Sequence, residues 1–501
     1  MAEQSLGAFL WSVSGAVGRT LLQFAAQIVL ARILGPTEYG IFALGVIVVM
    51  LSIYFADIGL AYGLIQKQDI SEDDIRFVWT WQWILGVTAS CALFSGAEAI
   101  AHGFGKPEAQ FVFRWLALVV LVNALAALPT ALLKKALDYR SLQIAQLTSY
   151  CVGYIVIGIP LALSGFGAGA LVAAWLAQTL VNFFMLYAKV RHSFALRLWI
   201  DDGARMLGYG AIVLSTNLIN WACSTIDKVF IGRLFPVNVV GLYTTAFNFV
   251  NAPAAAVYVS LQSVVFSACA RLQNDAGALR AVFLGLLCAV TLIAFPLFAV
   301  LGVGADVVMV AVFGRRWADA SQFLGVFAFV MPFLIVWGIS TPIIWNAGRA
   351  SLEFKLQVPI LLAWLALLYA LVDASAFAIA VATACFFAVR CVSMVIVVAR
   401  VIGLRLVEVL IAVRGGVLLT ALIALMAHFA LVAALRTTDN PQLQLLLLLA
   451  GAGCGYLIVV GALAPKLIDR KLHGYLAALS DRLPRWTMPV MRVLLRPKVL
   501  Q

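Results

Sequence analysis

The sequence predicts an all-α, polytopic membrane protein, and three observations lead to this fold class. Hydrophobic residues make up 64% of the chain and charged residues only 11%, whereas a soluble domain carries roughly 25% charged residues. The apolar residues gather in long runs that are separated by short polar segments. A bilayer core about 30 Å thick needs about 20 apolar residues per helix, and each span must satisfy its own backbone hydrogen bonds in lipid.

The apolar runs predict about fourteen transmembrane helices. The first run has no basic segment and no small-residue cleavage site before it, so we interpret it as a retained span and not as a signal peptide. The expected spans are residues 9–31, 39–65, 77–100, 111–133, 144–164, 168–189, 209–231, 239–266, 281–302, 321–345, 356–372, 374–399, 408–434 and 442–464. Between them we expect only short loops, the longest being an outer stretch at 302–320 and an inner link at 191–208.

The basic residues predict the orientation of these spans. Most of the 34 Lys and Arg residues lie in loops on the side of the amino terminus or in the tail after residue 465. Basic loops stay in the cytoplasm, so both termini should be cytoplasmic. Topology and contact with anionic lipid explain the net charge of +12, and no nucleic-acid partner is expected.

Two short stretches indicate an internal repeat. Residues 32–42 and 233–243 align without a gap and pair Gly40 with Gly241 and Phe42 with Tyr243, as in a duplicated unit. Six expected spans precede the inner link at 191–208, an even number, so the two repeated units on either side of it should have the same orientation about a pseudo-two-fold axis along the membrane normal. The predicted domains are an N-terminal six-helix lobe at 1–200, a C-terminal six-helix lobe at 201–400, an additional helix pair at 401–465 and a basic amphipathic cytoplasmic tail at 466–501.

The tail has two interpretations. Its apolar residues recur at helical spacing between basic ones, as in a helix that lies on the inner leaflet. It would serve either as a docking site for a partner enzyme or as a simple anchor.

Enzyme chemistry is not expected. Seven of the eight cysteines fall within the expected spans, Cys269 lies just after one, and the four histidines are scattered. This pattern is typical of buried apolar residues and not of a metal site. The sequence therefore predicts no catalytic residues, no metal and no cofactor.

Two arginines inside spans are the main candidates for substrate binding. Arg19 and Arg390 each lie about ten residues from the cytoplasmic end of a span, which corresponds to a depth of roughly 15 Å. A charge at this depth indicates function, and a guanidinium can bind a diphosphate through two charge-assisted hydrogen bonds. Alternatively, Arg19 pairs with Asp57, which is expected at nearly the same depth. Asp57 could also be a coupling carboxylate that binds a proton or sodium.

Other polar residues in the spans suit a sugar or a gate. Asn217 and Asn220 lie one turn apart and share a helix face, so they would bind the substrate or, alternatively, a neighbouring helix. Asp227 and Lys228 are adjacent near the outer end of the same span. They would form a gate or extend to the membrane interface.

Four stretches carry a family resemblance when they are read in order. Residues 32–42, 227–243, 313–319 and 346–350 together resemble bacterial polysaccharide transporters, the O-antigen and exopolysaccharide flippases of the multidrug/oligosaccharidyl-lipid/polysaccharide exporter superfamily. The resemblance implies two lobes that alternately open a central cationic cavity to either leaflet. It also implies a polyprenyl-pyrophosphate-linked oligosaccharide as cargo, for exopolysaccharide, capsule or lipopolysaccharide synthesis, with a polymerase and co-polymerase as partners.

Two other classes of function compete with this interpretation. A multidrug or organic-cation antiporter of the same superfamily would require a mainly acidic cavity, whereas two arginines and one aspartate are expected here at mid-depth. A membrane-embedded polymerase or ligase would require a large outer loop with basic and catalytic residues, and no loop of that size is expected.

Overall fold

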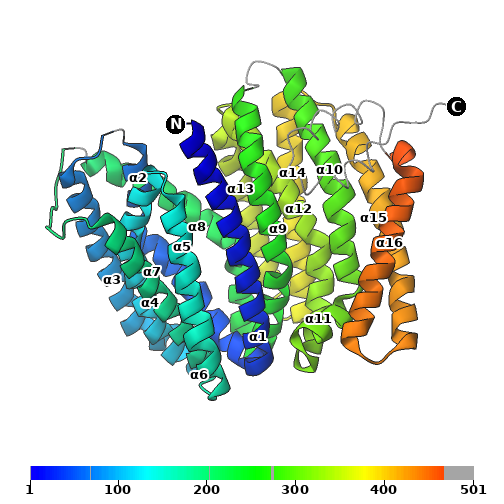
Figure 1. Cartoon of the computed structure of the whole chain (residues 1–501), viewed down its shortest axis with the longest axis horizontal. Coiled ribbons are helices and arrows are strands. Elements are labelled where there is room, and N and C mark those ends of the chain that lie inside the picture. Colours follow the sequence, from blue (N-terminus) through cyan, green and yellow to red (C-terminus); the bar gives the residue numbers. More distant parts are fainter. Residues whose placement is uncertain (1, 68, 202, 272–275, 468–501) are drawn as a thin grey trace. The chain divides into compact units, whose positions relative to one another are not determined.

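The computed structural model describes residues 2–67, 69–201, 203–271 and 276–467 (Figure 1). All regular elements among them are helices, which confirms the predicted all-α class. The chain divides into two compact units, Met1–Thr244 and Thr245–Gln501. The predicted amphipathic tail falls almost entirely at 468–501, outside the described residues.

The first unit is built around α4, which packs between α3 and α7 (Figure 1). Apolar side chains of α4, such as Leu116 and Val120, are fully buried. The elements of the unit are α1 (Ala2–Asp57), α2 (Leu60–Gln66), α3 (Glu72–Phe104), η1 (Pro107–Ala109), α4 (Gln110–Lys135), α5 (Tyr139–Tyr150), η2 (Cys151–Gly158), α6 (Ile159–Leu163), α7 (Ala168–Val190), α8 (Gly203–Leu234) and the start of α9 (Val237–Arg271).

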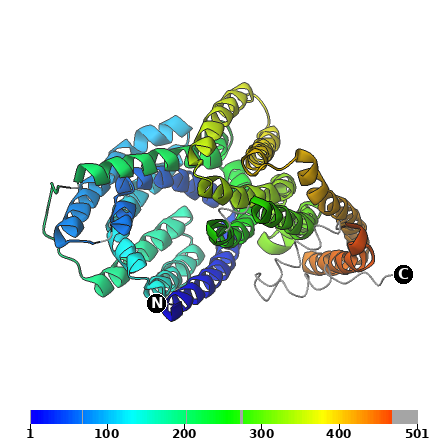
Figure 2. The same cartoon turned by 90° about the horizontal axis from the view of Figure 1, so that it is seen from above.

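In the second unit α12 packs on α10 and α14, while α15 packs on α10 and carries α16 at its side (Figures 1 and 2). The elements that follow α9 are α10 (Ala276–Val303), α11 (Ala305–Phe313), η3 (Arg315–Ala320), α12 (Ser321–Asn346), α13 (Ala350–Ala370), α14 (Ala376–Ile402), α15 (Leu406–Thr437) and α16 (Pro441–Leu467).

Within the described residues, eleven helices are long and apolar enough to cross a membrane. One of them, Gly18–Asp57, contains the end of the first predicted span and most of the second, because α1 continues across a sharp break at Gly35 and Pro36. Gly35 has φ 78°, a conformation that glycine adopts readily, and Pro36 suits the first position of the helical segment that follows. The protein is therefore multi-pass, while the total of fourteen spans stays a prediction.

Two local expectations were wrong. The span predicted at 39–65 is not continuous, because α1 ends at Asp57, and Ile58 and Gly59 adopt positive φ angles of 43° and 71° before α2 begins. The outer stretch 302–320 is not a loop, since its apolar residues form α11 and the short helix η3, where Trp317 is fully buried.

The two stretches that resemble each other in sequence lie face to face in the first unit. A methyl group on Gly40 would overlap the carbonyl oxygen of Val237, and one on Gly241 would overlap the carbonyl oxygen of Pro36. Pro36 and Val237 occupy equivalent positions in the gapless alignment of the two stretches. The contact is therefore reciprocal, as expected between two copies related by a two-fold axis.

Candidate functional site

Arg19 lies on α1 and contacts α5. Its Nη1 donates a hydrogen bond to Oε1 of Gln146, and its Nε is buried without a hydrogen-bond partner among the described residues. Buried N–H groups are normally satisfied, so this unsatisfied donor is unusual. Asp57 is not the partner of Arg19, and the alternative pairing considered from the sequence is not formed.

Arg19 is the first member of a row of polar side chains. Gln23 and Gln27 follow it at intervals of one helical turn, and Tyr150 and Tyr154 follow Gln146 at the same interval on the facing element. The hydroxyl of Tyr150 donates to the carbonyl oxygen of Gln23 at 3.4 Å. We call these six residues, which are Arg19, Gln23, Gln27, Gln146, Tyr150 and Tyr154, the polar row.

The polar row joins a cation to amides and aromatic rings. The rings of Tyr150 and Tyr154 are stacked with centroids 4.5 Å apart. Tyr150 directly precedes the π-helix η2 and Tyr154 lies within it, and π-helical turns occur frequently at functional sites. Sequence reasoning identified only Arg19 in this row. The repeated spacing of four residues on both 19–27 and 146–154 was the signal that could have revealed the rest.

Asp57 occupies the break between α1 and α2. Its carboxylate accepts a hydrogen bond from Nε2 of Gln82 at 3.4 Å and one from the backbone N–H of Ala61. Asp57 therefore contacts the first turn of α2, although the N-cap residue of that helix is Gly59. Its role as a coupling carboxylate stays a prediction.

Arg390 belongs to a different network, in the second unit. Its side chain is buried, its Nη2 donates to Oε1 of Gln357 at 3.0 Å, and its Cζ lies 4.4 Å from the ring centroid of Trp337. Nε2 of Gln357 donates to Glu353 at 2.8 Å, and Nε1 of Trp345 donates to the same carboxylate at 2.6 Å. A bound phosphate would therefore have to compete with an existing amide and aromatic contact.

Glu353 is the residue of this network that sequence reasoning missed. The corresponding span was expected to start at residue 356, which left Glu353 in a polar loop, but α13 begins at Ala350 and buries the carboxylate. Because a buried polar group is costly unless it is hydrogen-bonded, the Glu353 side chain requires the N–H donors of Trp345 and Gln357.

Asn217 and Asn220 lie one turn apart on α8, and both are partly exposed. The backbone carbonyl of Asn220 accepts a hydrogen bond from the Ser224 hydroxyl at 2.8 Å. Their proposed contact with sugar stays a prediction.

Asp227 and Lys228 are both buried, so their side chains do not extend to the membrane interface, which was one of the two alternatives from the sequence. The carboxylate of Asp227 accepts a hydrogen bond from the Tyr243 hydroxyl at 2.7 Å and lies 3.5 Å from Nζ of Lys228. Nζ of Lys228 also donates to the carbonyl oxygen of Ser224 at 2.6 Å. This cluster joins α8 to the start of α9 beside the reciprocal glycine contact.

We expect Asp227→Ala to lower the free energy of unfolding by about 3–5 kcal/mol, because removal of one partner leaves a buried cation without its carboxylate. In the double variant Asp227→Asn with Lys228→Met, the loss of unfolding free energy should be much smaller, because the ammonium of Lys228 is removed together with the carboxylate of Asp227. Thermal unfolding in detergent measures both. Equal destabilisation in the single and the double variant would show that the ion pair itself is unimportant.

Comparisons with known proteins agree with this architecture. Residues 29–322 match the model of a family described as "Polysaccharide biosynthesis protein". The teichuronic acid biosynthesis protein TuaB of Bacillus subtilis is 24% identical over 384 residues, covering 74% of this chain and 77% of TuaB. The succinoglycan biosynthesis transport protein ExoT of Rhizobium meliloti is 24% identical over 344 residues, covering 69% of each chain.

A solved structure shares the fold at low sequence identity. It is the lipid II flippase MurJ in an inward closed conformation, with a TM-score of 0.74, 13% identity, and coverage of 92% of this chain and 100% of MurJ. The family expected from the sequence is thereby confirmed, since its model spans more than half of the chain. This multi-pass helical protein belongs to the polysaccharide biosynthesis protein family.

Proposed function

We propose that this protein moves a polyprenyl-pyrophosphate-linked oligosaccharide from the cytoplasmic to the periplasmic leaflet of a bacterial inner membrane. The product would enter the synthesis of exopolysaccharide, capsule or lipopolysaccharide O-antigen. Family membership supports the substrate class, and the fold that the chain shares with a lipid II flippase supports the type of transport. In this proposal both termini are cytoplasmic, and a polymerase with its co-polymerase takes over the transported unit.

The polar row is the structural observation that carries the proposal. A pyrophosphate needs a cationic donor inside the membrane, and Arg19 has a buried N–H that no described residue satisfies. A sugar needs amide partners and flat apolar faces, which the glutamines and the stacked rings of Tyr150 and Tyr154 supply. In this assignment Arg19 binds the phosphate groups and the rest of the row contacts the glycan.

The leaflet of the lipid-linked oligosaccharide tests this function. Cells that lack the chain and cells that carry it are compared after treatment with a membrane-impermeant glycosidase, which trims only units that face the periplasm. We expect intact units to accumulate, protected, in the cells without the chain.

Expression of the intact chain in these cells should again allow the glycosidase to trim the lipid-linked oligosaccharide. If the units are trimmed equally with and without the protein, the flippase assignment is wrong. Efflux of cationic drugs by the same two strains would then test the antiporter alternative.

A further inference from the structure

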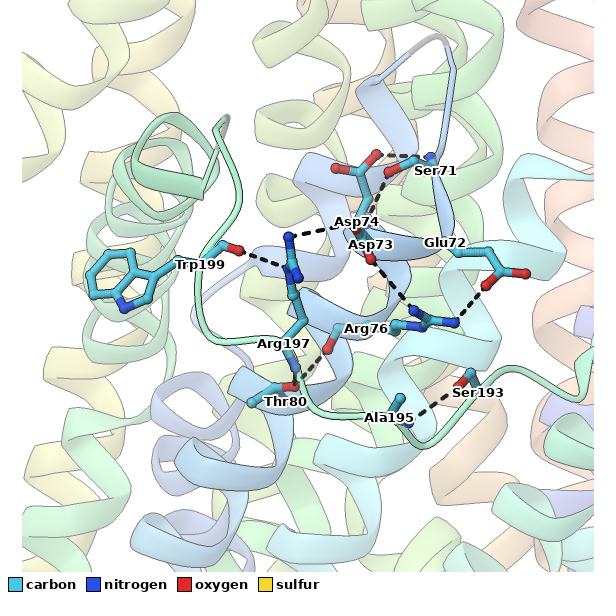
Figure 3. Close-up of polar contacts among 10 residues, drawn as sticks. All are labelled: Ser71, Glu72, Asp73, Asp74, Arg76, Thr80, Ser193, Ala195, Arg197 and Trp199. Carbon is cyan, nitrogen blue, oxygen red and sulfur yellow. Dashed lines mark hydrogen bonds and ion pairs between the residues drawn. The ribbon is translucent and has the colours of Figure 1, made fainter.

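A cavity of about 380 Å³ lies where the linker between α7 and α8 crosses the start of α3. The linker, residues 191–201, has no helical structure, in contrast to most of the chain. Figure 3 shows its polar contacts with α3. The residues that line the cavity are Lys67, Ser71, Asp73, Asp74, Arg197, Trp199, Ile200 and Asp201.

The wall of the cavity on α3 is fixed by a capping box. The Ser71 hydroxyl accepts a hydrogen bond from the Asp74 N–H at 3.1 Å, and the Asp74 carboxylate accepts one from the Ser71 N–H at 2.9 Å (Figure 3). Nζ of Lys67 lies 2.8 Å from the same carboxylate. This wall is preorganised, because each polar group in it holds another in place.

The opposite wall is held by Arg197 of the linker. Its backbone N–H donates to the Thr80 hydroxyl at 2.8 Å, its Nε donates to the Trp199 carbonyl oxygen at 3.2 Å, and its Nη2 lies 3.6 Å from Asp73 (Figure 3). The indole N–H of Trp81 also donates to the carbonyl oxygen of Leu198 at 3.3 Å. The linker is therefore anchored to α3 and does not hang free.

Among the charged groups that line the cavity, the carboxylate of Asp201 has no ion-pair partner among the described residues. Lys67 pairs with Asp74 and Arg197 pairs with Asp73, while Asp201 is exposed and forms no ion pair with a described residue. A guanidinium has five N–H donors, so Arg197 also retains donors beyond the two contacts of its Nε and Nη2. The cavity thus offers a carboxylate for a cation and, beside it, a donor for an anion.

The linker that carries Arg197 and Asp201 also exposes four large apolar side chains, of which Trp199 lines the cavity. Between 52% and 73% of the surface of each is exposed, and all four belong to this one short linker: Phe194, Leu196, Leu198 and Trp199. The linker crosses α3 near its start, and α3 is long and apolar enough to span a membrane from Glu72 onward. These side chains therefore lie at the end of a span, where apolar and aromatic residues insert between lipids.

We propose that the cavity binds a phospholipid whose headgroup carries a primary ammonium, as in a phosphoethanolamine lipid. The ammonium donates hydrogen bonds to Asp201 and lies beside the indole of Trp199, which favours cations. The lipid phosphate accepts from the free N–H groups of Arg197, and the acyl chains lie along Leu196 and Leu198. The bound lipid holds the linker to the membrane, a role distinct from transport.

Retained lipid tests this proposal directly. The full-length protein is reconstituted in vesicles with equal amounts of phosphatidylethanolamine and phosphatidylglycerol, extracted in mild detergent, and analysed by native mass spectrometry. We expect the wild type to retain the ethanolamine lipid about fivefold over the glycerol lipid, which corresponds to about 1 kcal/mol. Asp201→Asn should bring this ratio close to one, because the amide keeps the shape but loses the charge.

The matched control is Asp439→Asn, which removes an exposed aspartate from the turn between α15 and α16 and should leave the ratio at the wild-type value. Unfolding temperatures of both variants should equal that of the wild type, since neither side chain is buried. Equal retention of the two lipids by the wild type, or an unchanged ratio in Asp201→Asn, would overturn the proposal. Neither result depends on whether the protein transports an oligosaccharide.

Discussion

Arg19→Ala is expected to abolish movement of the lipid-linked oligosaccharide while the protein still reaches the membrane. The change removes the only cation of the polar row and leaves the side chain of Gln146 without its donor. A pyrophosphate would then have to enter the hydrocarbon region with no charged partner in that row, and charges at this depth are costly. The leaflet of the oligosaccharide, measured with the impermeant glycosidase, reports the loss.

Two further variants show whether the guanidinium itself is needed. Arg19→Lys should recover only part of the activity, because a lysine keeps the charge but loses the planar fork that binds phosphate through two hydrogen bonds. Arg114→Ala removes a half-exposed arginine that lies 3.9 Å from Glu98 and should leave transport unchanged. Full activity in Arg19→Ala would exclude this residue as a substrate ligand and would leave the family assignment intact.

Gly40→Ala and Gly241→Ala are each expected to reduce both stability and transport. The added methyl would overlap a backbone carbonyl oxygen, and backbone cannot move aside as the tip of a flexible side chain can. Overpacking of this kind costs about 1–3 kcal/mol. Thermal unfolding in detergent and the glycosidase assay measure the two effects.

The double glycine variant distinguishes one shared contact from two independent ones. Because both methyl groups force apart the same pair of stretches, the double variant should lose less than the sum of the single losses. Gly103→Ala is the matched control, since no atom lies within 4 Å of the added methyl and alanine favours the helix by about 1 kcal/mol. Strict additivity, or wild-type stability in the single variants, would contradict a tight reciprocal contact.

Most of the helices could be predicted from the sequence, because an apolar run long enough to cross the membrane can satisfy its backbone hydrogen bonds in lipid as a helix. Spans such as 111–133 and 168–189 coincide closely with α4 and α7. The errors occurred where hydrophobicity continues through a change of backbone direction. Ile58 and Gly59 interrupt an apolar run, and α11 is an apolar helix too short to span the membrane.

The candidate site was less predictable than the fold, because hydropathy gives the depth of a residue but not its partner. Arg19 and Arg390 were found as charges in apolar runs, yet Gln146 and Gln357, which contact them, are neutral and far away in sequence. Asp57 was assigned from its depth, whereas a helix break determines its contacts. The repeat was visible in the sequence, and its reciprocal packing depends on backbone positions that only the structure provides.

The break at Gly35 and Pro36 also predicts the depth of the residues on either side of it. Proline supplies no N–H to the preceding turn, so carbonyl groups there need water, and we expect the break at the boundary of the hydrocarbon. At 1.5 Å per residue, Arg19 would then lie about 24 Å from this boundary and Asp57 about 32 Å from it. Since the hydrocarbon is about 30 Å thick, this placement puts Asp57 at the opposite surface and Arg19 about 6 Å inside it, which is shallower than the depth expected from the sequence. A charged headgroup entering from that surface would therefore pass the aspartate first and lose its water only when it reaches the arginine.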